Sequence, residues 1–294
     1  MNNHMRHNLT RLALVSLLMA WPTASRAQLA APNKAGVAMG HLHYTVKDVE
    51  INKKFWMALG ATPIKIGTAD VMKLPDILIF LEKGESSGGN EEAVVNHVAF
   101  MVPSVKETLA KLEAAGFKIR AGGGGDVGNM ITPEGEAIEI FSQQTEQGGF
   151  IPDKGHTDAA ADRLNRKLTV PITSHHIHFE LPTENAVPVA RDWYIKMFGA
   201  IPGVRWHYPA ANLPGVNFNF REKRQPPQRL PTKGRLLDHI GLEVKDLEQF
   251  CKKLEADGIK LDVPYTRNPN GFASAFLTDP WGTYIELTEG LNRF

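Results

Sequence analysis

The sequence predicts an α+β protein built from four copies of one unit. The first observation is an internal repeat, in which "NHVAFMVPSVKETLAKLEAAGFKI" aligns with the later segment "DHIGLEVKDLEQFCKKLEADGIKL". His97 corresponds to His239, and Gly116, which suits a helix C-terminus, corresponds to Gly258. Each copy begins with alternating apolar residues and continues as an amphipathic helix, so each predicts a strand followed by a helix.

Two further copies complete the repeat. They begin at His41, with "HLHYTVKDVEINKKFWMALGATPI", and at His176, with "HIHFELPTENAVPVARDWYIKMFGAIPG". After each helix the chain returns to short strands, and the second and fourth copies close with the hairpins "ITPEGEAIEIF" and "LTDPWGTYIEL", in which Pro and Gly turn the chain. The repeated unit is therefore a βαβββ module that occurs four times.

The modules are expected to pair in chain order, the first with the second and the third with the fourth. We therefore predict a first domain over 38–145, a linker over 146–172 and a second domain over 173–291. The linker is rich in Gly, Asp and Gln, although its segment "DAAADRLNRKL" has a composition that a helix could adopt.

The N-terminal residues are typical of a secretory signal. Two arginines precede an apolar run from Leu12 to Trp21, and small residues follow up to Ala27. This pattern predicts a signal peptide over 1–27 that is cleaved after Ala27. The apolar run has about ten residues, fewer than the ~20 that a membrane-spanning helix needs. We therefore expect a mature chain with no membrane anchor, in the periplasm or secreted.

The net charge indicates which kinds of partner the protein binds, and the cysteine content indicates whether a disulfide can stabilise it. The formal net charge is +1 at pH 7, which produces no field that would attract nucleic acid or an anionic membrane. The expected partner is therefore a small-molecule substrate. Cys251 is the only cysteine and lies on the apolar face of a predicted helix, so an internal disulfide is excluded and a buried thiol is expected.

Strand alternation predicts which side chains face a site, because residues two apart on a strand share a face. In the third copy Ile177 and Phe179 are expected to pack under the helices, which leaves His176, His178 and Glu180 on the opposite face. The equivalent face of the other copies carries His41 and His43, His97, Glu139, His239, Gly241, Glu243 and Glu286. Polar residues that alternate in this way indicate that one face holds a site.

These repeats and motifs resemble the vicinal oxygen chelate superfamily, which includes glyoxalase I, extradiol ring-cleaving dioxygenases and the fosfomycin and bleomycin resistance proteins. The resemblance covers nearly all of the chain after residue 27. It implies that two βαβββ modules form one cup-shaped domain, so four modules imply two cups.

The resemblance also implies two histidines and one glutamate as metal ligands in each half. These are His41, His97 and Glu139 in the first half and His176, His239 and Glu286 in the second. Two imidazoles and a carboxylate with open positions suit Fe²⁺ best, and also Zn²⁺, Mn²⁺ or Ni²⁺. No residue is expected to bind an organic cofactor.

Two departures from the family argue against its standard reactions. Glyoxalase I takes a fourth ligand, usually a carboxylate, from the last strand of an odd-numbered module, but the matching strands "ILIFLEK" and "VNFNFRE" have apolar or Asn residues at their centres. The segment "FLTDPWGTYIE" resembles the closing motif of extradiol dioxygenases, with Asp279 and Glu286 in place. Phe276, however, replaces its tyrosine, and the expected upstream histidine is absent near Arg267.

The sequence thus favours an exported, metal-dependent enzyme that acts on a small substrate with vicinal oxygens, with dioxygenase-like or glyoxalase/lyase-like chemistry. The metal would act as a Lewis acid, and His178 or Glu243 would accept a proton. The alternative is a binding protein of the bleomycin-resistance kind, which holds a small molecule between modules and performs no chemistry. Which half is active stays open at this point.

Overall fold

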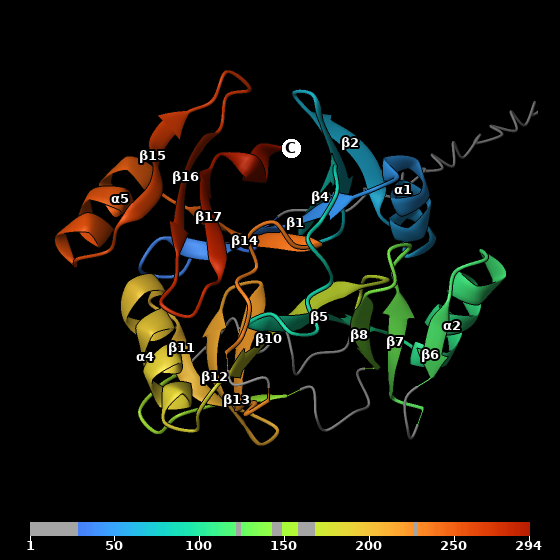
Figure 1. Cartoon of the computed structure of the whole chain (residues 1–294), viewed down its shortest axis with the longest axis horizontal. Coiled ribbons are helices and arrows are strands. Elements are labelled where there is room, and N and C mark those ends of the chain that lie inside the picture. The colour runs from blue at the N-terminus through green and yellow to red at the C-terminus, as the bar shows by residue number, and fades with distance from the viewer. Residues whose placement is uncertain (1–28, 122–124, 143–148, 158–167, 226–227) are drawn as a thin grey trace, which may run out of the picture.

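Two mixed sheets and their flanking helices make up the computed structural model, which describes residues 29–121, 125–142, 149–157, 168–225 and 228–294 (Figure 1). The predicted signal peptide, and residues 158–167 of the segment that could form a helix, lie outside the described residues. No described helix is long and apolar enough to cross a membrane.

The four predicted βαβββ modules are confirmed. The first contains β1 (Val37–Val46), α1 (Val49–Ala58), β2 (Thr62–Ile66), β3 (Ala69–Lys73) and β4 (Leu78–Lys83). The second contains β5 (Val95–Val102), α2 (Val105–Ala114), β6 (Ile119–Ala121), β7 (Val127–Ile131) and β8 (Ala137–Ser142). The third contains β10 (Thr173–Leu181), α4 (Ala186–Phe198), β11 (Ile201–Arg205), β12 (Tyr208–Leu213) and β13 (Val216–Glu222). The fourth contains β14 (Leu237–Val244), α5 (Leu247–Ala256), β15 (Leu261–Arg267), β16 (Ala273–Thr278) and β17 (Tyr284–Glu289).

Short elements follow the second and fourth modules. Strand β9 (Phe150–Pro152) lies in the predicted linker and pairs with β11 at the edge of a sheet. The 3₁₀ turn η2 (Leu291–Arg293) ends the chain. The glycines that were predicted to stop two helices, Gly116 and Gly258, follow α2 and α5 with φ of +86°, a conformation that glycine adopts at low cost.

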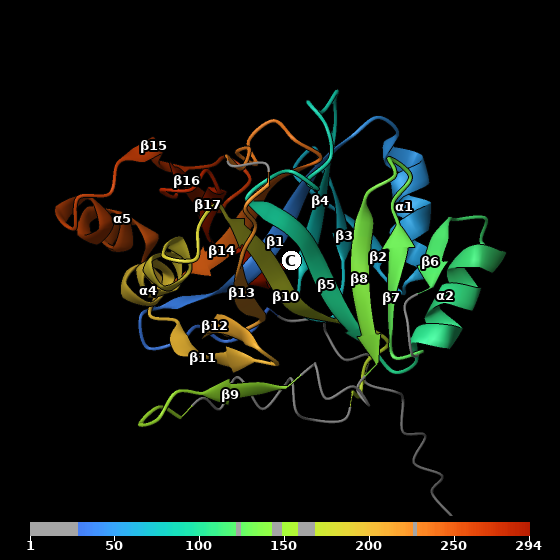
Figure 2. The same cartoon turned by 60° about the horizontal axis from the view of Figure 1, so that its bottom comes forward.

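The modules do not pair in chain order. The first sheet has the strand order β15-β16-β17-β14-β1-β4-β3-β2, and the second has β6-β7-β8-β5-β10-β13-β12-β11-β9. The first module therefore shares a sheet with the fourth, and the second shares one with the third, as Figure 2 shows for β5 and β10 at the middle of the second sheet. The predicted domains over 38–145 and 173–291 are each divided between the two sheets, so that expectation is wrong.

The reason lies in two connections that cross between the sheets, 84–94 after β4 and 223–236 after β13. They run beside each other, with hydrogen bonds from Leu230 N to the Glu92 carbonyl and from Val94 N to the Leu230 carbonyl. Fully buried Asn90 donates to the Leu237 carbonyl (3.1 Å) and accepts from Leu237 N (2.9 Å), which attaches the first connection to the start of β14. Each connection carries the chain into the other sheet.

The two central strand pairs have the same register. His43 lies opposite His239 where β1 and β14 run antiparallel, and His178 lies opposite His97 where β10 and β5 do. Each pair also has a register shift at the equivalent point, between Met39 and His41 on β1 and between Ser174 and His176 on β10.

The predicted division of the strand faces is confirmed. The apolar side chains of the central strands, such as Ile177 and Phe179 on β10, belong to one buried core that also includes the inner faces of the helices. Cys251 is buried in this core on α5, as predicted, and burial raises the pKa of its thiol to about 11. Helices α4 and α5 lie together at one side of the molecule, and α1 and α2 at the other (Figure 1).

A buried hydrogen bond joins the two sheets through α4. The hydroxyl of Tyr194 on α4 donates to Oδ2 of Asp279 (2.8 Å), which lies in the β16–β17 hairpin of the other sheet. The remaining oxygen of Asp279 accepts from the backbone N–H groups of Trp281 (2.9 Å) and Thr283 (2.7 Å). Tyr194 and Asp279 are both buried, so this carboxylate depends on protein donors.

Tyr194→Phe should lower the free energy of unfolding by about 1–3 kcal/mol, because Asp279 would lose one donor in a site that is shielded from water. Urea unfolding measures the change. Tyr265→Phe on the edge strand β15 is the control, with an expected change of about 0.5 kcal/mol or less. Equal effects of the two substitutions would contradict a role for this bond in joining the sheets.

Two candidate metal centres

The six predicted ligands come together in two sets, which differ from the predicted halves. The first cluster consists of His41, His43, His239 and Glu286, and the second cluster consists of His97, His176, His178 and Glu139. The predicted sets His41, His97, Glu139 and His176, His239, Glu286 are therefore wrong as groupings. Each histidine of an odd-numbered module instead meets a histidine and a glutamate of the even-numbered module that shares its sheet.

In the first cluster both histidines meet one carboxylate oxygen. Nε2 of His41 lies 2.9 Å from Oε2 of Glu286, and Nε2 of His239 lies 3.2 Å from the same oxygen. One ligand atom each from His41, His43, His239 and Glu286 lie within 4.8 Å of one another. His43 Nε2 also lies 3.2 Å from Oε2 of Glu82, a largely exposed carboxylate that sequence reasoning missed.

Gly241 leaves the space that the His41 ring occupies. A Cβ atom at this position would lie 2.0 Å from both Nδ1 and Cε1 of His41, far inside van der Waals contact. The residue opposite His176 at the equivalent point of the second sheet is Ala99. The absence of a side chain at 241 is therefore a requirement of the first cluster alone.

The second cluster has the same arrangement. Nε2 of His97 lies 3.3 Å and Nε2 of His176 lies 3.4 Å from Oε2 of Glu139. The His178 ring lies 4.9 Å from the His97 ring, centroid to centroid, and one ligand atom of each of the three histidines lies within 4.8 Å of the others.

A neighbouring histidine orients His176. His175 Nδ1 lies 2.8 Å from His176 Nδ1, and both rings pack against Phe141. Simple alternation would put His175 on the face opposite to His176, but the register shift between Ser174 and His176 turns it toward the cluster side. A hydrogen bond at Nδ1 leaves Nε2 of His176 as the nitrogen that faces Glu139.

The histidines of the even-numbered modules also have partners at Nδ1, from the preceding residue. His239 Nδ1 lies 2.6 Å from the carboxylate oxygen Oδ1 of Asp238, and His97 Nδ1 lies 2.8 Å from the amide oxygen Oδ1 of Asn96. Asp238 and Asn96 each stand immediately before a predicted ligand in the aligned repeats, and the sequence prediction did not include them. The repeated acceptor immediately before each histidine was the signal that could have found them.

Burial sets the charge state of four of the cluster histidines. It lowers the pKa of His41, His176 and His178, and that of His43 to about 3, so these rings are neutral near pH 7. Burial also acts to lower the pKa of His239, but hydrogen bonds to Asp238 and Glu286 outweigh it and raise the value above the usual range.

Burial acts to raise the pKa of Glu286, but the hydrogen bonds from His239 and His41 outweigh it and hold the pKa well below its usual value. The neutral rings of His41 and His43 beside the ionised Glu286 offer donor atoms to a cation, whereas at His239 an ion would compete with a proton.

The donor atoms fit a divalent metal ion. Nε2 atoms of His97, His176 and His178 are shielded from solvent and make no hydrogen bond to any described residue, which is costly for buried polar atoms. Ligands of one small ion lie about 3 Å apart, close to the separations found here between imidazole nitrogen and carboxylate oxygen. His41, His239 and Glu286 could hold an ion in the first cluster, and His97, His176 and Glu139 in the second.

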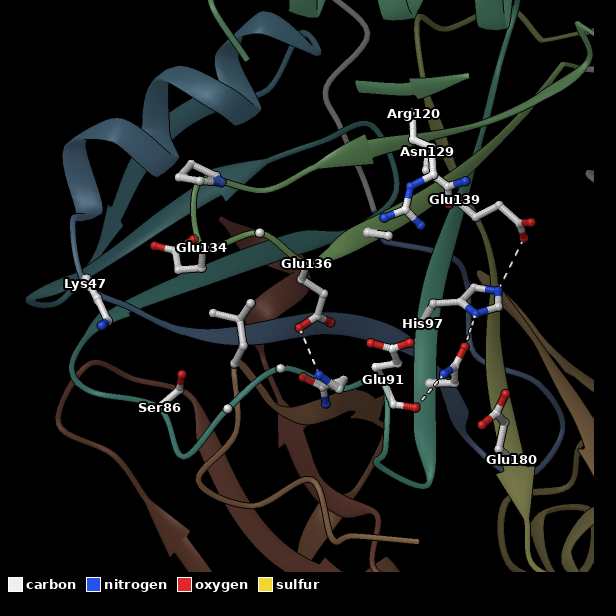
Figure 3. Close-up of a pocket in the computed structure, with 18 of the residues that line it drawn as sticks. Lys47, Ser86, Glu91, His97, Arg120, Asn129, Glu134, Glu136, Glu139 and Glu180 are labelled. Atoms are coloured by element: carbon white, nitrogen blue, oxygen red, sulfur yellow. Dashed lines mark hydrogen bonds and ion pairs between the residues drawn. The ribbon is translucent and has the colours of Figure 1, made fainter. Parts of the chain in front are cut away.

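A cavity of about 1010 Å³ opens beside the second cluster (Figure 3). His97 and Glu139 contribute to its wall, together with Arg120 and Asn129, which Figure 3 shows beside Glu139. Further wall residues come from the two crossing connections and from β10 and β13. They are Ser86, Asn90, Glu91 and Lys223 in the connections, Glu180 on β10 and Arg221 on β13. This volume is sufficient for a small organic molecule.

Glu243 forms hydrogen bonds to the end of the chain. Its carboxylate accepts hydrogen bonds from Thr288 Oγ1 (2.9 Å), Gly290 N (2.7 Å) and Leu291 N (3.1 Å). These bonds hold the C-terminal turn, and the predicted role of Glu243 as a proton acceptor stays a prediction. His178 lies in the second cluster, and its role as a base likewise stays a prediction.

Comparisons with known proteins agree with this fold. Residues 178–287 match the model of the Glyoxalase/Bleomycin resistance protein/Dioxygenase superfamily. Glyoxalase I from Zea mays has a TM-score of 0.62 at 14% identity, over 87% of this chain and 94% of that chain. A proposed dioxygenase from Bacillus subtilis has a TM-score of 0.56 at 12% identity, over 90% of this chain and 86% of that chain. Curated protein sequences give no match. At these identities the structural likeness shows the fold, which agrees with the family-model match.

Glu136, on the wall of the cavity, should make stability depend on pH. Burial raises the pKa of its carboxyl to about 7, so the folded protein binds this proton more tightly than the unfolded chain. Its contribution to stability is therefore present at pH 4.5 and is lost as the pH rises to about 7. The free energy of unfolding of Glu136→Gln, taken relative to that of the wild type, should therefore rise by about 1–3 kcal/mol between pH 4.5 and pH 8.

Urea unfolding at both pH values gives this difference, and Glu113→Gln on the exposed face of α2 is the control, with no expected pH-dependent change. A Glu136→Gln variant whose stability follows the wild-type pH curve would show that the carboxyl titrates normally.

Proposed function

Since residues 178–287 belong to the vicinal oxygen chelate superfamily and the whole described chain has its fold, we propose that this protein is a divalent-metal-dependent enzyme. It acts on a small substrate with two neighbouring oxygen atoms, as a lyase or isomerase. The observation that carries the proposal is the convergence of two histidines on one glutamate oxygen, twice, with a cavity beside one of the two sets.

His97, His176 and Glu139 would hold the ion that faces the cavity. A divalent ion bound there supplies Lewis acidity, which polarises a substrate oxygen and makes a neighbouring proton more acidic. The protein places the imidazoles of His97 and His176 beside one carboxylate, and His175 and Asn96 keep the rings in their orientations through Nδ1.

His178 accepts the substrate proton in this proposal. Its ring is buried and neutral, and its Nε2 atom makes no hydrogen bond to any residue of the described chain, so a lone pair or an N–H group is free for the substrate. The Tyr208 ring packs edge-on against it, at 4.7 Å between centroids, and limits its movement. A base held close to the chelated oxygens needs no reorganisation during the reaction.

Ring cleavage of a catechol receives less support. In the first cluster Phe276 packs edge-on against His239, at 5.5 Å between centroids, so an apolar ring occupies the position of the acid–base tyrosine in the resembling motif. On the neighbouring strand of the second cluster, Asn129 lies opposite Glu139 as Phe276 lies opposite Glu286. Neither residue can donate and accept a proton as tyrosine does.

Metal content tests the proposal. The purified chain, incubated with Fe²⁺, Zn²⁺, Mn²⁺ or Ni²⁺ and then desalted, should retain ions at both clusters, and His176→Ala and His41→Ala should each remove one of them. His156→Ala, in an exposed loop, is the control and should retain both. If no ion binds to the wild type, the proposal fails, and a saturable ligand without product would then favour a binding protein.

We further propose that the chain is exported, on the strength of the N-terminal signal pattern. Cleavage after Ala27 would leave Gln28 as the first residue of the mature protein. Mass spectrometry of the protein recovered from the periplasm or the medium of an expressing bacterium should find this N-terminus. Recovery of the full-length chain from the cytoplasm alone would contradict export.

A further inference from the structure

The two clusters share their ligands but differ in the charges that surround them. The proposal that follows rests on the proposed metal binding, and it concerns which cluster carries the reaction and what kind of substrate it takes. Strand register gives the comparison, because β2, β3 and β4 of the first sheet correspond to β11, β12 and β13 of the second.

Negative and apolar groups surround the first cluster. His239 bonds to the carboxylate of Asp238, which adds a second negative charge to that of Glu286. The Phe80 ring lies 4.8 Å from the His41 ring, and Phe276 packs on His239. A carboxylate behind a metal-binding imidazole makes the imidazole a stronger ligand, so this cluster is built to bind a cation tightly.

A buried cation accompanies the second cluster instead. Asn96 takes the place of Asp238, and Arg205 stands at the end of β11 where Ile66 ends β2. Arg205 is 2% exposed, its Nε donates to Asn219 Oδ1 (2.5 Å), and its charge acts on Glu139 and His176. The single carboxylate of this cluster is therefore balanced by a guanidinium.

Three cations also meet the carboxylate of Glu180, two residues along β10 from His178. Glu180 is fully buried on β10 and forms ion pairs with Arg221 on β13 and with Arg229 Nη2 (2.6 Å). Lys223 lies 3.9 Å from the same carboxylate, and Arg221 and Lys223 contribute to the cavity wall. A divalent ion in the second cluster would thus keep most of its positive charge until an anion binds beside it.

The C-terminal turn packs beside the first cluster. Leu291 is buried in a small apolar cluster with Ile66, Leu78 and Phe80, the residue that touches His41. Glu243 holds the start of this turn, and Lys73 Nζ bonds to the carbonyl oxygen of Phe294. Figure 1 shows the C-terminus lying within the curve of the first sheet.

We propose that the first cluster retains its ion as a covered, tightly bound centre. The second cluster binds its ion together with a small anionic substrate that presents a carboxylate beside a hydroxyl or carbonyl oxygen, and it carries the reaction. The cations beside the second cluster favour this substrate class, because the anion neutralises the ion and lies close to Arg205, Arg221 and Lys223.

The test measures ion affinity and anion binding at each cluster, with Co²⁺ as the ion and oxalate as the probe anion. Competition with a chelator should resolve two Co²⁺ affinities in the wild type, the tighter lost in His41→Ala and the weaker lost in His176→Ala. Asp238→Asn should weaken the tighter site by about 10–100-fold, and the matched Asn96→Asp should strengthen the weaker site by about tenfold.

Oxalate should change the visible absorption of Co²⁺ in the wild type and in His41→Ala, and should leave His176→Ala unchanged. Arg205→Met should weaken oxalate binding by about tenfold, and Arg205→Lys should restore most of it. Urea unfolding of both Arg205 variants checks that they fold, and the Asn96→Asp measurement tests the charge argument without them.

Three outcomes would overturn the proposal. Equal Co²⁺ affinities at the two clusters would show that the difference in charge does not change how tightly each cluster binds an ion. Oxalate binding at the first cluster would show that it is accessible. Failure of the wild type to bind Co²⁺ would overturn the proposed function as well. The first two outcomes overturn only the difference between the clusters, so they can be told apart from a failure of the proposed function.

Discussion

The antiparallel pairing of β1 with β14 and of β5 with β10 is the constraint on which both candidate centres depend. Each pair places a histidine of one module directly opposite a histidine of another, and the parallel neighbour β17 or β8 adds the glutamate. The pairing arises because the two crossing connections hydrogen-bond to each other and because Asn90 attaches one of them to the start of β14. Without this crossing, His41 and His239 would belong to different sheets.

The pairing buries polar groups, which lowers the stability of the fold unless these groups have hydrogen-bond partners or bind an ion. His41 and His176 are almost completely buried, and their rings face the carboxylates of Glu286 and Glu139. Hydrogen bonds at Nδ1 fix one side of three of the rings, so the opposite nitrogens point inward toward the glutamates. A polar cluster of this kind is well suited to a cation, because the ion satisfies several lone pairs at once.

The strands that flank each pair then make the two centres different. The first sheet has apolar residues at the positions where the second has Arg205 and Asn219, and the C-terminal turn packs on that apolar surface. The second sheet keeps a polar surface with a cavity beside it. A duplicated fold can in this way hold two sets of the same ligands and give them different charge and access.

The sequence by itself determined the four βαβββ modules, because each copy repeats the change from strand to helix period and the glycine that ends α2 or α5. It also determined which residues share the site face, because alternation along a strand is a local property. Local rules failed at His175, where a register shift turns the side chain, and they did not reveal that the carboxylate of Glu243 holds a turn. Only the tertiary structure decided which modules share a sheet, and hence which histidines meet which glutamate. Which modules share a sheet depends on contacts between two connections that are far apart in the chain, and no local sequence pattern in either connection predicts these contacts.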